Sequence, residues 1–487
     1  MKREHAAFQH TMIRASAGTG KTFQLSNRFL GLASSGFPPE QILATTFARK
    51  AAGEILDRIV TRLAEAICDE ERLPELAKHL ERPSFDPGEC IALLRTLIGR
   101  LHRLQIGTLD SFFVQLAGSF SLELGLPLGW RIVDALDDRK LRRAAIQQVL
   151  ESRTTEDSVR LVHLLSKGEA TRSVTRQIED VVGNLYDLFL ATERDAWQRL
   201  PRPRALDDAA IRDALTQVAA LDGFADKRFI NARDKNLKAA ENHDWDLFIC
   251  EGLAKCIVCG QSTYYNKRIE PHILDAYQPL LDHARAELLT RLANQTEGTW
   301  ELLHHFDDGY RKLKATERAM RFDDITRTLA GEFSARRVEE LAYRLDGPLG
   351  HLLLDEFQDT SRAQWDVLRP FAKRVTSNGG SRSFFCVGDA KQAIYGWRGG
   401  VAEIFDSAGT ELPGIVEQSL AESYRSAPIV IDVVNRVFAN LPVNESLTEW
   451  PTVAAGWHRR YEEHTTAKGH LAGHSRLLVA ERAVDGQ

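Results

Sequence analysis

A glycine-rich segment near the N-terminus has the residue types and spacing that bind phosphate groups. Ala15-Ser-Ala-Gly-Thr-Gly-Lys-Thr22 fits the P-loop pattern, with alanine at the first glycine position. Glycines allow backbone N–H groups to curve around phosphate oxygens. Lys21 adds a positive charge, and the Thr22 hydroxyl is a suitable ligand for Mg²⁺. The predicted ATP-binding residues of this loop are Ala15, Ser16, Ala17, Gly18, Thr19, Gly20, Lys21 and Thr22.

A second candidate site lies far downstream, where an apolar run ends in acidic residues. The segment His351-Leu-Leu-Leu-Asp-Glu-Phe-Gln-Asp-Thr360 reads as a buried strand followed by carboxylates. Parallel strands place their last residues at the sheet edge where ligands of α/β proteins bind. Asp355 is predicted to hold Mg²⁺, and Glu356 to orient or deprotonate an attacking water. The role of Asp359 stays open between capping a following helix and acting on substrate.

The elements that must position these residues follow an alternating pattern. Short apolar runs at 11–15, 41–47, 104–108, 350–354 and 383–387 predict strands, and helical spacing follows at 50–66 and from 111 to about 120. This alternation predicts a parallel sheet covered by helices. Between about 136 and 320 the chain is charged and poor in strand signals, with helices expected at 137–152, 158–166, 174–190 and 272–293. We interpret this stretch as a helical insertion.

The bulk composition is that of a globular protein large enough for several domains. The chain has 487 residues, 43% hydrophobic and 27% charged, with a net charge of −5. That charge excludes a generally basic nucleic-acid binder but leaves room for a local basic groove. Six scattered cysteines do not suggest a disulfide framework, and no apolar run is long enough to span a membrane. We therefore expect a cytoplasmic protein with no membrane partner.

Further motifs, in order along the chain, give these two sites a family context. They are Thr45–Ala52 (TTFARKAA), Thr108–Phe113 (TLDSFF), Phe322–Ile325 (FDDI), Val387–Gly399 (VGDAKQAIYGWRG) and Leu420–Ser426 (LAESYRS). Together with ASAGTGKT and DEFQDTS, they make the chain resemble a superfamily 1 DNA helicase of the UvrD/RecB type, closest to the RecB and AddA helicase–nuclease subunits. Two positions depart from the family pattern: Asp110 stands where histidine is usual, and Ser423 where asparagine is usual.

The resemblance implies an α/β fold of the RecA-like P-loop NTPase type, with a parallel sheet interrupted by a helical insertion. The first RecA-like lobe would comprise residues 1–135 and 320–412, the helical insertion 136–319, and the beginning of a second RecA-like lobe 413–487. Family motifs of the later second lobe, and a nuclease, are not found in the sequence. We therefore expect a fragment, or a partner chain that supplies the missing lobe, and a chain that alone binds nucleotide but hydrolyses it slowly.

The resemblance also implies roles for residues outside the two first sites. Gln392 would sense the γ-phosphate, Arg425 would reach it as an arginine finger, and Tyr424 would stack on adenine. Asp389 would order the attacking water, while Gln9 is a weaker candidate for reading the adenine. The catalytic set is then Lys21, Asp355, Glu356, Gln392 and Arg425.

Single-stranded DNA is the expected partner, because exposed aromatic rings and hydroxyls bind bases and phosphates without sequence preference. The residues implied as DNA contacts are Thr46, Phe47, Lys50, Thr108, Ser111, Tyr395, Trp397 and Arg398. At least one of Phe112 and Phe113 is expected to pack in the core instead. Cys250, Cys256 and Cys259 contain a C-x2-C half-site, but ordinary packing is favoured over metal binding.

The predicted function is an ATP- and Mg²⁺-dependent DNA helicase or translocase, 3′ to 5′ by resemblance, acting in double-strand-break repair and recombination. Its predicted partners are single-stranded DNA, duplex ends, and a second helicase–nuclease subunit or a chain carrying the missing lobe. One alternative is a UvrD-type repair helicase without nuclease. Another is a non-motor subunit that binds DNA under the control of ATP.

Overall fold

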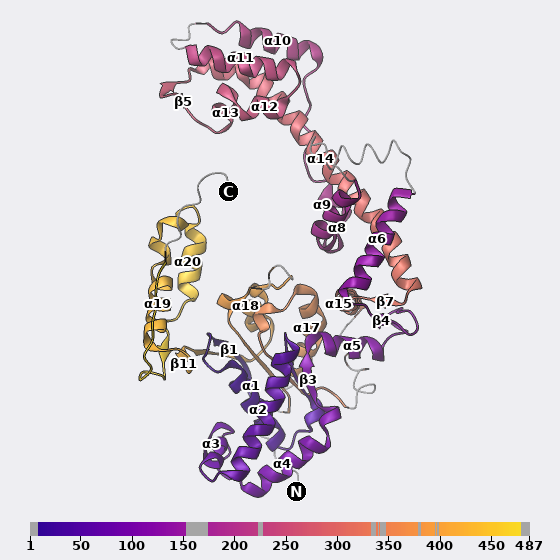
Figure 1. Cartoon of the computed structure of the whole chain (residues 1–487), viewed down its shortest axis with the longest axis vertical. Coiled ribbons are helices and arrows are strands. Elements are labelled where there is room, and N and C mark those ends of the chain that lie inside the picture. The colour runs from indigo at the N-terminus through magenta and orange to yellow at the C-terminus, as the bar shows by residue number, and fades with distance from the viewer. Residues whose placement is uncertain are drawn as a thin grey trace. The chain divides into compact units, whose positions relative to one another are not determined.

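The chain folds into two units joined by two crossings of the backbone. The computed structural model describes residues 8–151, 174–222, 227–332, 338, 340, 347–377, 381–394, 396 and 399–478. One compact unit combines Met1–Ile132 with Met320–Gln487, and the other is Val133–Ala319 (Figure 1). The second unit lies close to the limits predicted for the insertion. The predicted helix at 158–166 falls outside the described residues.

The first unit is built on a six-stranded sheet in which every pairing is parallel, in the order β10-β1-β9-β8-β2-β3. The strands are β1 (His10–Ala15), β2 (Ile42–Thr46), β3 (Gln105–Thr108), β8 (His351–Leu354), β9 (Ser383–Gly388) and β10 (Ile415–Leu420). The predicted α/β fold with a parallel sheet is confirmed. The sequence pattern predicts that β10 opens the second lobe, but this strand pairs with β1 from His10↔Ile415 to Ala15↔Leu420. The sheet of the first lobe therefore extends to Leu420.

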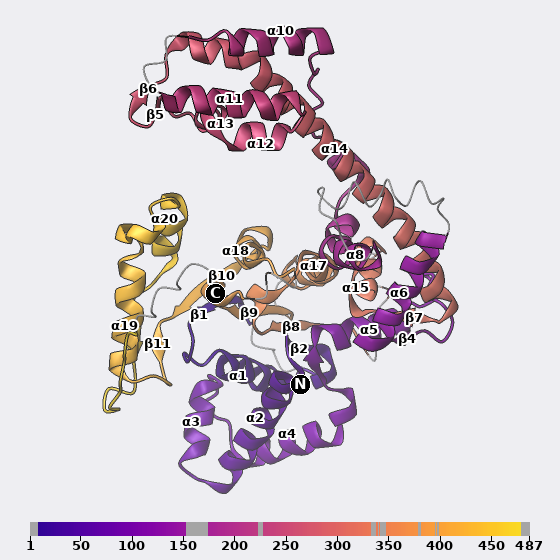
Figure 2. The ribbon, with the colours of Figure 1, turned by 45° about the horizontal axis from the view of Figure 1, so that its top comes forward.

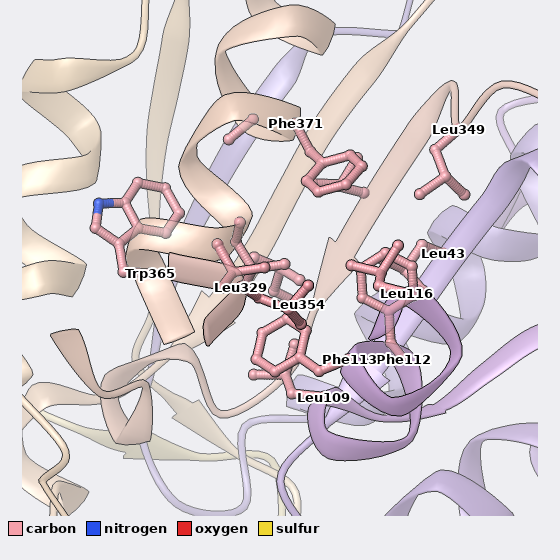
Figure 3. Close-up of a cluster of buried hydrophobic side chains, with 14 of the residues drawn as sticks. Leu43, Leu109, Phe112, Phe113, Leu116, Leu329, Leu349, Leu354, Trp365 and Phe371 are labelled. Carbon is pink, nitrogen blue, oxygen red and sulfur yellow. The ribbon is translucent and has the colours of Figure 1, made fainter. Parts of the chain in front are cut away.

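Helices cover both faces of this sheet, which explains why the central strands are apolar along their whole length. Successive residues of β8 point to opposite faces, so Leu352 and Leu354 join one core and Leu353 joins the other. Figure 3 shows part of the first core, where Phe112 lies near Phe371 with ring centroids 5.8 Å apart. The helices of this unit up to the insertion are α1 (Lys21–Ser34), α2 (Arg49–Cys68), α3 (Arg72–His79), α4 (Pro87–Gly99) and α5 (Leu109–Ser119). Those after it are α15 (Phe322–Glu332), α17 (Arg362–Ser377) and α18 (Ala402–Glu411).

The residues after β10 form a small annex of the first unit. Its elements are β11 (Glu422–Ser423), α19 (Pro428–Ala439), α20 (Pro451–Arg460) and β12 (Thr465–Thr466). β11 and β12 pair in parallel, Glu422↔Thr465 and Ser423↔Thr466, as a separate two-stranded sheet. A stack of aromatic rings, with Phe438 and Tyr461 4.6 Å apart, packs α19 against the segment that follows α20.

The second unit is helical, as predicted, and is organised around one long helix. α14 (Pro271–Thr316) has 46 residues, much longer than the predicted helix at 272–293. Tyr277 and Leu280 of α14 belong to one hydrophobic core, and Phe306 and Tyr310 to another. In Figures 1 and 2, α14 accordingly runs from the α10–α13 group to α6 and α8. A single continuous helix therefore supports both cores of the insertion.

The remaining elements of this unit are short by comparison. They are α6 (Ala135–Glu151), α8 (Val174–Ala191), α9 (Arg194–Trp197), α10 (Asp208–Ala219), α11 (Lys227–Glu241), α12 (Trp245–Cys250), α13 (Gly252–Val258), β5 (Thr263–Tyr264) and β6 (Lys267–Arg268). β4 (Arg131–Ile132) and β7 (Ala319–Met320) lie at the junctions between the units. No helix formed by the described residues combines the length and apolar character needed to cross a lipid bilayer.

Candidate active site

The glycine-rich loop connects the end of β1 to the start of α1 at the carboxyl edge of the sheet. Gly18 and Gly20 adopt φ of 80° and 90°, a left-handed conformation that favours glycine. The backbone N–H and the hydroxyl of Thr19 both donate to the Ser16 carbonyl, at 3.3 and 2.8 Å, and close the turn. No side chain among the described residues caps α1. The first N–H groups of α1 therefore point their partial positive charge at the loop, as a phosphate site requires.

Asp355 follows β8 directly and lies beside this loop. Its backbone N–H donates to the Thr45 carbonyl at 2.8 Å, which continues the β2–β8 pairing past the strand. Its carboxylate accepts a hydrogen bond from the Thr22 hydroxyl. Burial, followed by the negative charge of Glu356, raises the pKa of Asp355 to about 6. The structure thus brings together the two residues predicted to hold Mg²⁺.

Glu356 turns back from the strand end towards Lys21. It has a φ of 49°, in the left-handed region that a residue with a side chain rarely adopts. Its Oε2 atom lies 2.6 Å from Nζ of Lys21, and Oε1 of Gln392 lies 3.4 Å from the same nitrogen. Lys21 is 9% exposed, so a charge that is nearly buried has two oxygen partners. Three predicted catalytic residues from separate segments therefore meet at one point.

One residue of the site, Gln358, was missed in the sequence. Its Nε2 donates to Oε2 of Glu356 at 2.8 Å, and its Oε1 accepts from the backbone N–H of Asp389 at 3.0 Å. Oδ2 of Asp389 in turn accepts from Nε2 of Gln392 at 2.7 Å. We call Lys21, Glu356, Gln358, Asp389 and Gln392 the polar ring, since their contacts form a closed cycle. Only the position of Gln358 next to the acidic pair could have indicated it.

Residues 422–426 pack directly against the phosphate loop. The Tyr424 N–H donates to the Gly18 carbonyl at 2.8 Å, and the Cβ atom of Arg425 lies where a side chain on Gly18 would be. Ser423 is fully buried, and its Oγ accepts from the N–H groups of Arg425 and Ser426, each at 3.3 Å. Serine therefore organises this turn at the position where asparagine is usual. Tyr424 is 58% exposed beside the loop, and its hydroxyl donates to Glu422 at 2.8 Å.

The residues predicted to contact DNA differ in how they are presented. Thr46 is 1% exposed, and its hydroxyl has no hydrogen-bond partner among the described residues. The Thr108 hydroxyl accepts from the Ser111 N–H at 3.2 Å and caps α5. Lys50 and Ser111 are exposed, and Phe47 is half-buried. Tyr395, Trp397 and Arg398 lie outside the described residues.

Phe112 and Phe113 are both buried, 3% and 1% exposed, so the core role expected for at least one of them holds for both. They line the core shown in Figure 3. Burial leaves neither ring free to stack on a base.

Asp359 is not the cap of the following helix. The Ser361 hydroxyl accepts from the Gln364 N–H at 3.2 Å while the Gln364 side chain accepts from the Ser361 N–H at 2.9 Å, which is a capping box for α17. Asp359 is 6% exposed, and its Oδ1 has no hydrogen-bond partner among the described residues. Burial and the charge of Glu356 raise the pKa of Asp359 to about 6. Of the two sequence interpretations, the helix cap is therefore wrong.

The cysteines of the helical unit form no recognisable metal site. Cys250 and Cys259 are exposed and Cys256 is partly buried, and all three are free thiols. Within the described residues, no group of three or more histidine, cysteine, aspartate or glutamate side chains is arranged to hold a metal ion.

Comparisons with known proteins were made against family models and curated sequences. Residues 2–413 match the family model described as "UvrD/REP helicase N-terminal domain". A subunit of the "ATP-dependent helicase/nuclease" of Streptococcus equi subsp. zooepidemicus strain H70 is 23% identical over 492 residues, covering 91% of this chain and 38% of that protein. The protein with the same name from Streptococcus thermophilus strain LMD-9 is 26% identical over 490 residues, covering 88% of this chain and 38% of its own length. The chain thus spans about 38% of the length of the curated relatives it matches.

Proposed function

Because the chain belongs to the UvrD/REP helicase family, we propose that it is the ATP-hydrolysing part of a DNA helicase related to the helicase–nuclease subunits. It moves along single-stranded DNA, 3′ to 5′, during double-strand-break repair and recombination. The observation that carries this proposal is the meeting of Lys21, Glu356 and Gln392 at the phosphate loop, since these residues come from three distant motifs.

The residues of the site divide the work of hydrolysis between them. The loop N–H groups and Lys21 bind the β- and γ-phosphates, and Lys21 exchanges its contact with Glu356 for the phosphate. Glu356 is then free to accept a proton from the attacking water. Gln392 contacts the γ-phosphate through the amide that now faces Lys21. Lys21 thus holds the base in place until the nucleotide arrives.

The same site fits Mg²⁺. The Thr22 hydroxyl and the Asp355 carboxylate offer oxygen ligands, and Mg²⁺ commonly takes one or two carboxylates together with phosphate oxygens. When bound, Mg²⁺ neutralises phosphate charge and stabilises the leaving group. Asp355 and Thr22 orient the nucleotide by holding that charge at the edge of the sheet.

Residues beside the phosphate loop complete the nucleotide and DNA sites. Tyr424 stacks on the adenine and Arg425 reaches the γ-phosphate, which their packing against Gly18 supports. The exposed Lys50 and Ser111 bind DNA phosphates, and Phe47 stacks on a base. Tyr395, Trp397 and Arg398 extend this DNA surface, and Thr46 and Thr108 support it from below.

The chain acts together with other protein, and this part of the proposal rests on its C-terminal annex. α19 exposes Ile429, Val430, Val433 and Val437, at 38–56%, which is unusual for aliphatic side chains on one helix. We assign this surface to the remainder of a second RecA-like lobe, whether on the same polypeptide or on another. The name of the relatives also supports a nuclease and a second subunit. The proposed location is the cytoplasm, where the six free thiols stay reduced.

The decisive experiment measures ATP binding and hydrolysis by the purified chain, with and without single-stranded DNA. Glu356→Gln is expected to lower the hydrolysis rate by about 100-fold or more while leaving binding intact, because it removes only the base. Lys21→Ala is expected to abolish binding. Glu71→Gln, an exposed carboxylate distant in sequence from every motif, is the matched control.

Failure of the wild-type chain to bind ATP would refute the proposal. DNA-stimulated hydrolysis that survives in Glu356→Gln would refute the assignment of the base. Binding without turnover in the wild-type chain would assign the missing catalytic groups to the absent part of the second lobe.

A further inference from the structure

Gln358 occupies a position that the proposed function does not yet explain. It is 1% exposed, although its side chain is fully polar. A buried amide that lacks partners is costly, so residues of this type are retained where their hydrogen bonds matter. All the bonds of this amide go to the neighbourhood of the phosphate loop.

We infer that Gln358 is a positioning residue for the proposed ATP hydrolysis: it holds Glu356 at the phosphate site and ties it to the segment that carries Gln392. The inference rests on the proposed function and deepens it. Gln358 touches neither nucleotide nor water in this arrangement, so its effect passes through Glu356 and Asp389.

The first step is the contact with Glu356. Within the described residues, the carboxylate of Glu356 accepts hydrogen bonds from Nζ of Lys21 at 2.6 Å and from Nε2 of Gln358 at 2.8 Å. When Lys21 turns to the phosphates, the contact with Gln358 remains. The amide also lies 3.5 Å from Oδ2 of Asp359, between two negative groups. It therefore fixes one orientation of Glu356 relative to Asp359.

The second step is the contact with β9. Oε1 of Gln358 accepts from the Asp389 N–H at 3.0 Å, and Asp389 holds the amide of Gln392 at 2.7 Å. A Cβ atom on Gly388 would lie 2.5 Å from Oε1 of Gln358. Glycine at 388 thus lets the backbone approach the amide closely. A movement at Gln392 is therefore transmitted to the base through one side chain.

Only an amide satisfies both contacts, because it donates through nitrogen and accepts through oxygen. Methionine has nearly the same length and volume but can replace neither bond. Gln358→Met therefore breaks both links of the polar ring while leaving the phosphate loop and Lys21 unchanged.

The test compares Gln358→Met with Gln364→Met in the full chain. Gln364 undergoes the same chemical change six positions later, but its side chain only caps α17. Gln358→Met is expected to lower kcat for DNA-stimulated ATP hydrolysis by about 10- to 100-fold, the loss of one charge-assisted hydrogen bond, with KM changed less than about 2-fold. Gln364→Met is expected to keep both constants near those of the wild type. A general loss of folding would instead weaken nucleotide binding together with kcat.

A second measurement does not require turnover. Hydrogen exchange at the Asp389 amide reports the bond to Gln358 directly, since opening of that bond exposes the N–H. We expect Gln358→Met to speed this exchange by about 10-fold or more, and Gln364→Met to leave it unchanged. Binding of a non-hydrolysable ATP analogue should alter exchange at residues 388–392 in the wild type and in Gln364→Met, but much less in Gln358→Met.

The outcomes separate the two claims. A wild-type chain that binds no ATP would refute the proposed function, and the exchange rate at Asp389 without nucleotide would still decide on the link through Gln358. The inference is overturned if Gln358→Met exchanges like the wild type at Asp389, or if its kcat stays within about 2-fold of the wild-type value in an active chain.

Discussion

Replacing Asp355 with asparagine is expected to stabilise the nucleotide-free chain and to abolish ATP hydrolysis. The side chain is 7% exposed, and burial together with the charge of Glu356 raises its pKa to about 6 from an ordinary value of 3.8. An ionised Asp355 is therefore less stable in the folded chain than in the unfolded chain. Asparagine has nearly the same shape and no charge, so the substitution removes that penalty together with the ligand for Mg²⁺.

The magnitude follows from the two pKa values. They differ by about two pH units, and each unit corresponds to about 1.36 kcal/mol, so ionised Asp355 costs the folded chain up to about 3 kcal/mol. Because the folded-state pKa is raised, the stability from protonated Asp355 is fully present below pH 3.8 and is lost as the pH rises through about 6. The stabilisation by Asp355→Asn should therefore be largest at pH 8 and vanish near pH 4. Imperfect hydrogen bonding of the asparagine with Thr22 reduces the gain, so about 1–3 kcal/mol is expected at pH 8.

The assay is urea denaturation of the wild type and the variant at several values between pH 4 and pH 8, without nucleotide. Asp366→Asn, which replaces a half-buried carboxylate of α17 paired with Arg362, serves as the control and should change stability little. Adding Mg²⁺ and an ATP analogue should raise the unfolding midpoint of the wild type but not of Asp355→Asn. A variant that is less stable than the wild type at pH 8, or whose effect does not depend on pH, would refute the reasoning.

Three further predictions concern other parts of the chain. Gly18→Ala is expected to weaken nucleotide binding about tenfold, as measured by titration with a fluorescent ATP analogue, because the φ of 80° costs about 1–2 kcal/mol and the new Cβ would lie 2.8 Å from that of Arg425. Asn236→Ala should destabilise the helical unit by at least about 2 kcal/mol, since this buried amide bonds two carbonyls and two N–H groups; exchange should rise in α11–α13 while ATP binding stays unchanged. Burial raises the pKa of Cys90 to about 11 and raises that of Cys386 further; both thiols should therefore react with a disulfide reagent at pH 8 far more slowly than the exposed cysteines, and equal rates would contradict their burial.

Much of the fold was predictable because its signals are local. The strand, glycine turn and helix around Lys21 are specified within a few residues, since apolar β1 is followed by residues that tolerate left-handed φ. The acidic end of β8 was located for the same reason. Helix limits were less accurate: α14 continues to Thr316, far beyond the predicted 293, because core contacts with α6 and α8 stabilise residues whose own pattern is weak.

Long-range pairing decided what the pattern of residues left open. β10 joins β1 because its backbone completes an open sheet edge, and side-chain periodicity does not tell which sheet a strand joins. The hydroxyl of Thr46 is buried and that of Thr108 caps α5, although motif position alone predicts both as DNA contacts. Burial and local hydrogen bonding are properties of the packed chain, so the motif could not reveal them.

The sequence by itself determined which chemical groups the site contains: a phosphate loop, two carboxylates and an amide in recognisable motifs. The tertiary structure alone decided how they meet, since Lys21 and Glu356 are 335 positions apart and their contact depends on the parallel order of β1, β9 and β8. It also revealed Gln358, whose residue type carries no signal of its own. The physical reason is that motif chemistry is written in neighbouring residues, whereas a hydrogen-bonded ring depends on distances that only the folded sheet fixes.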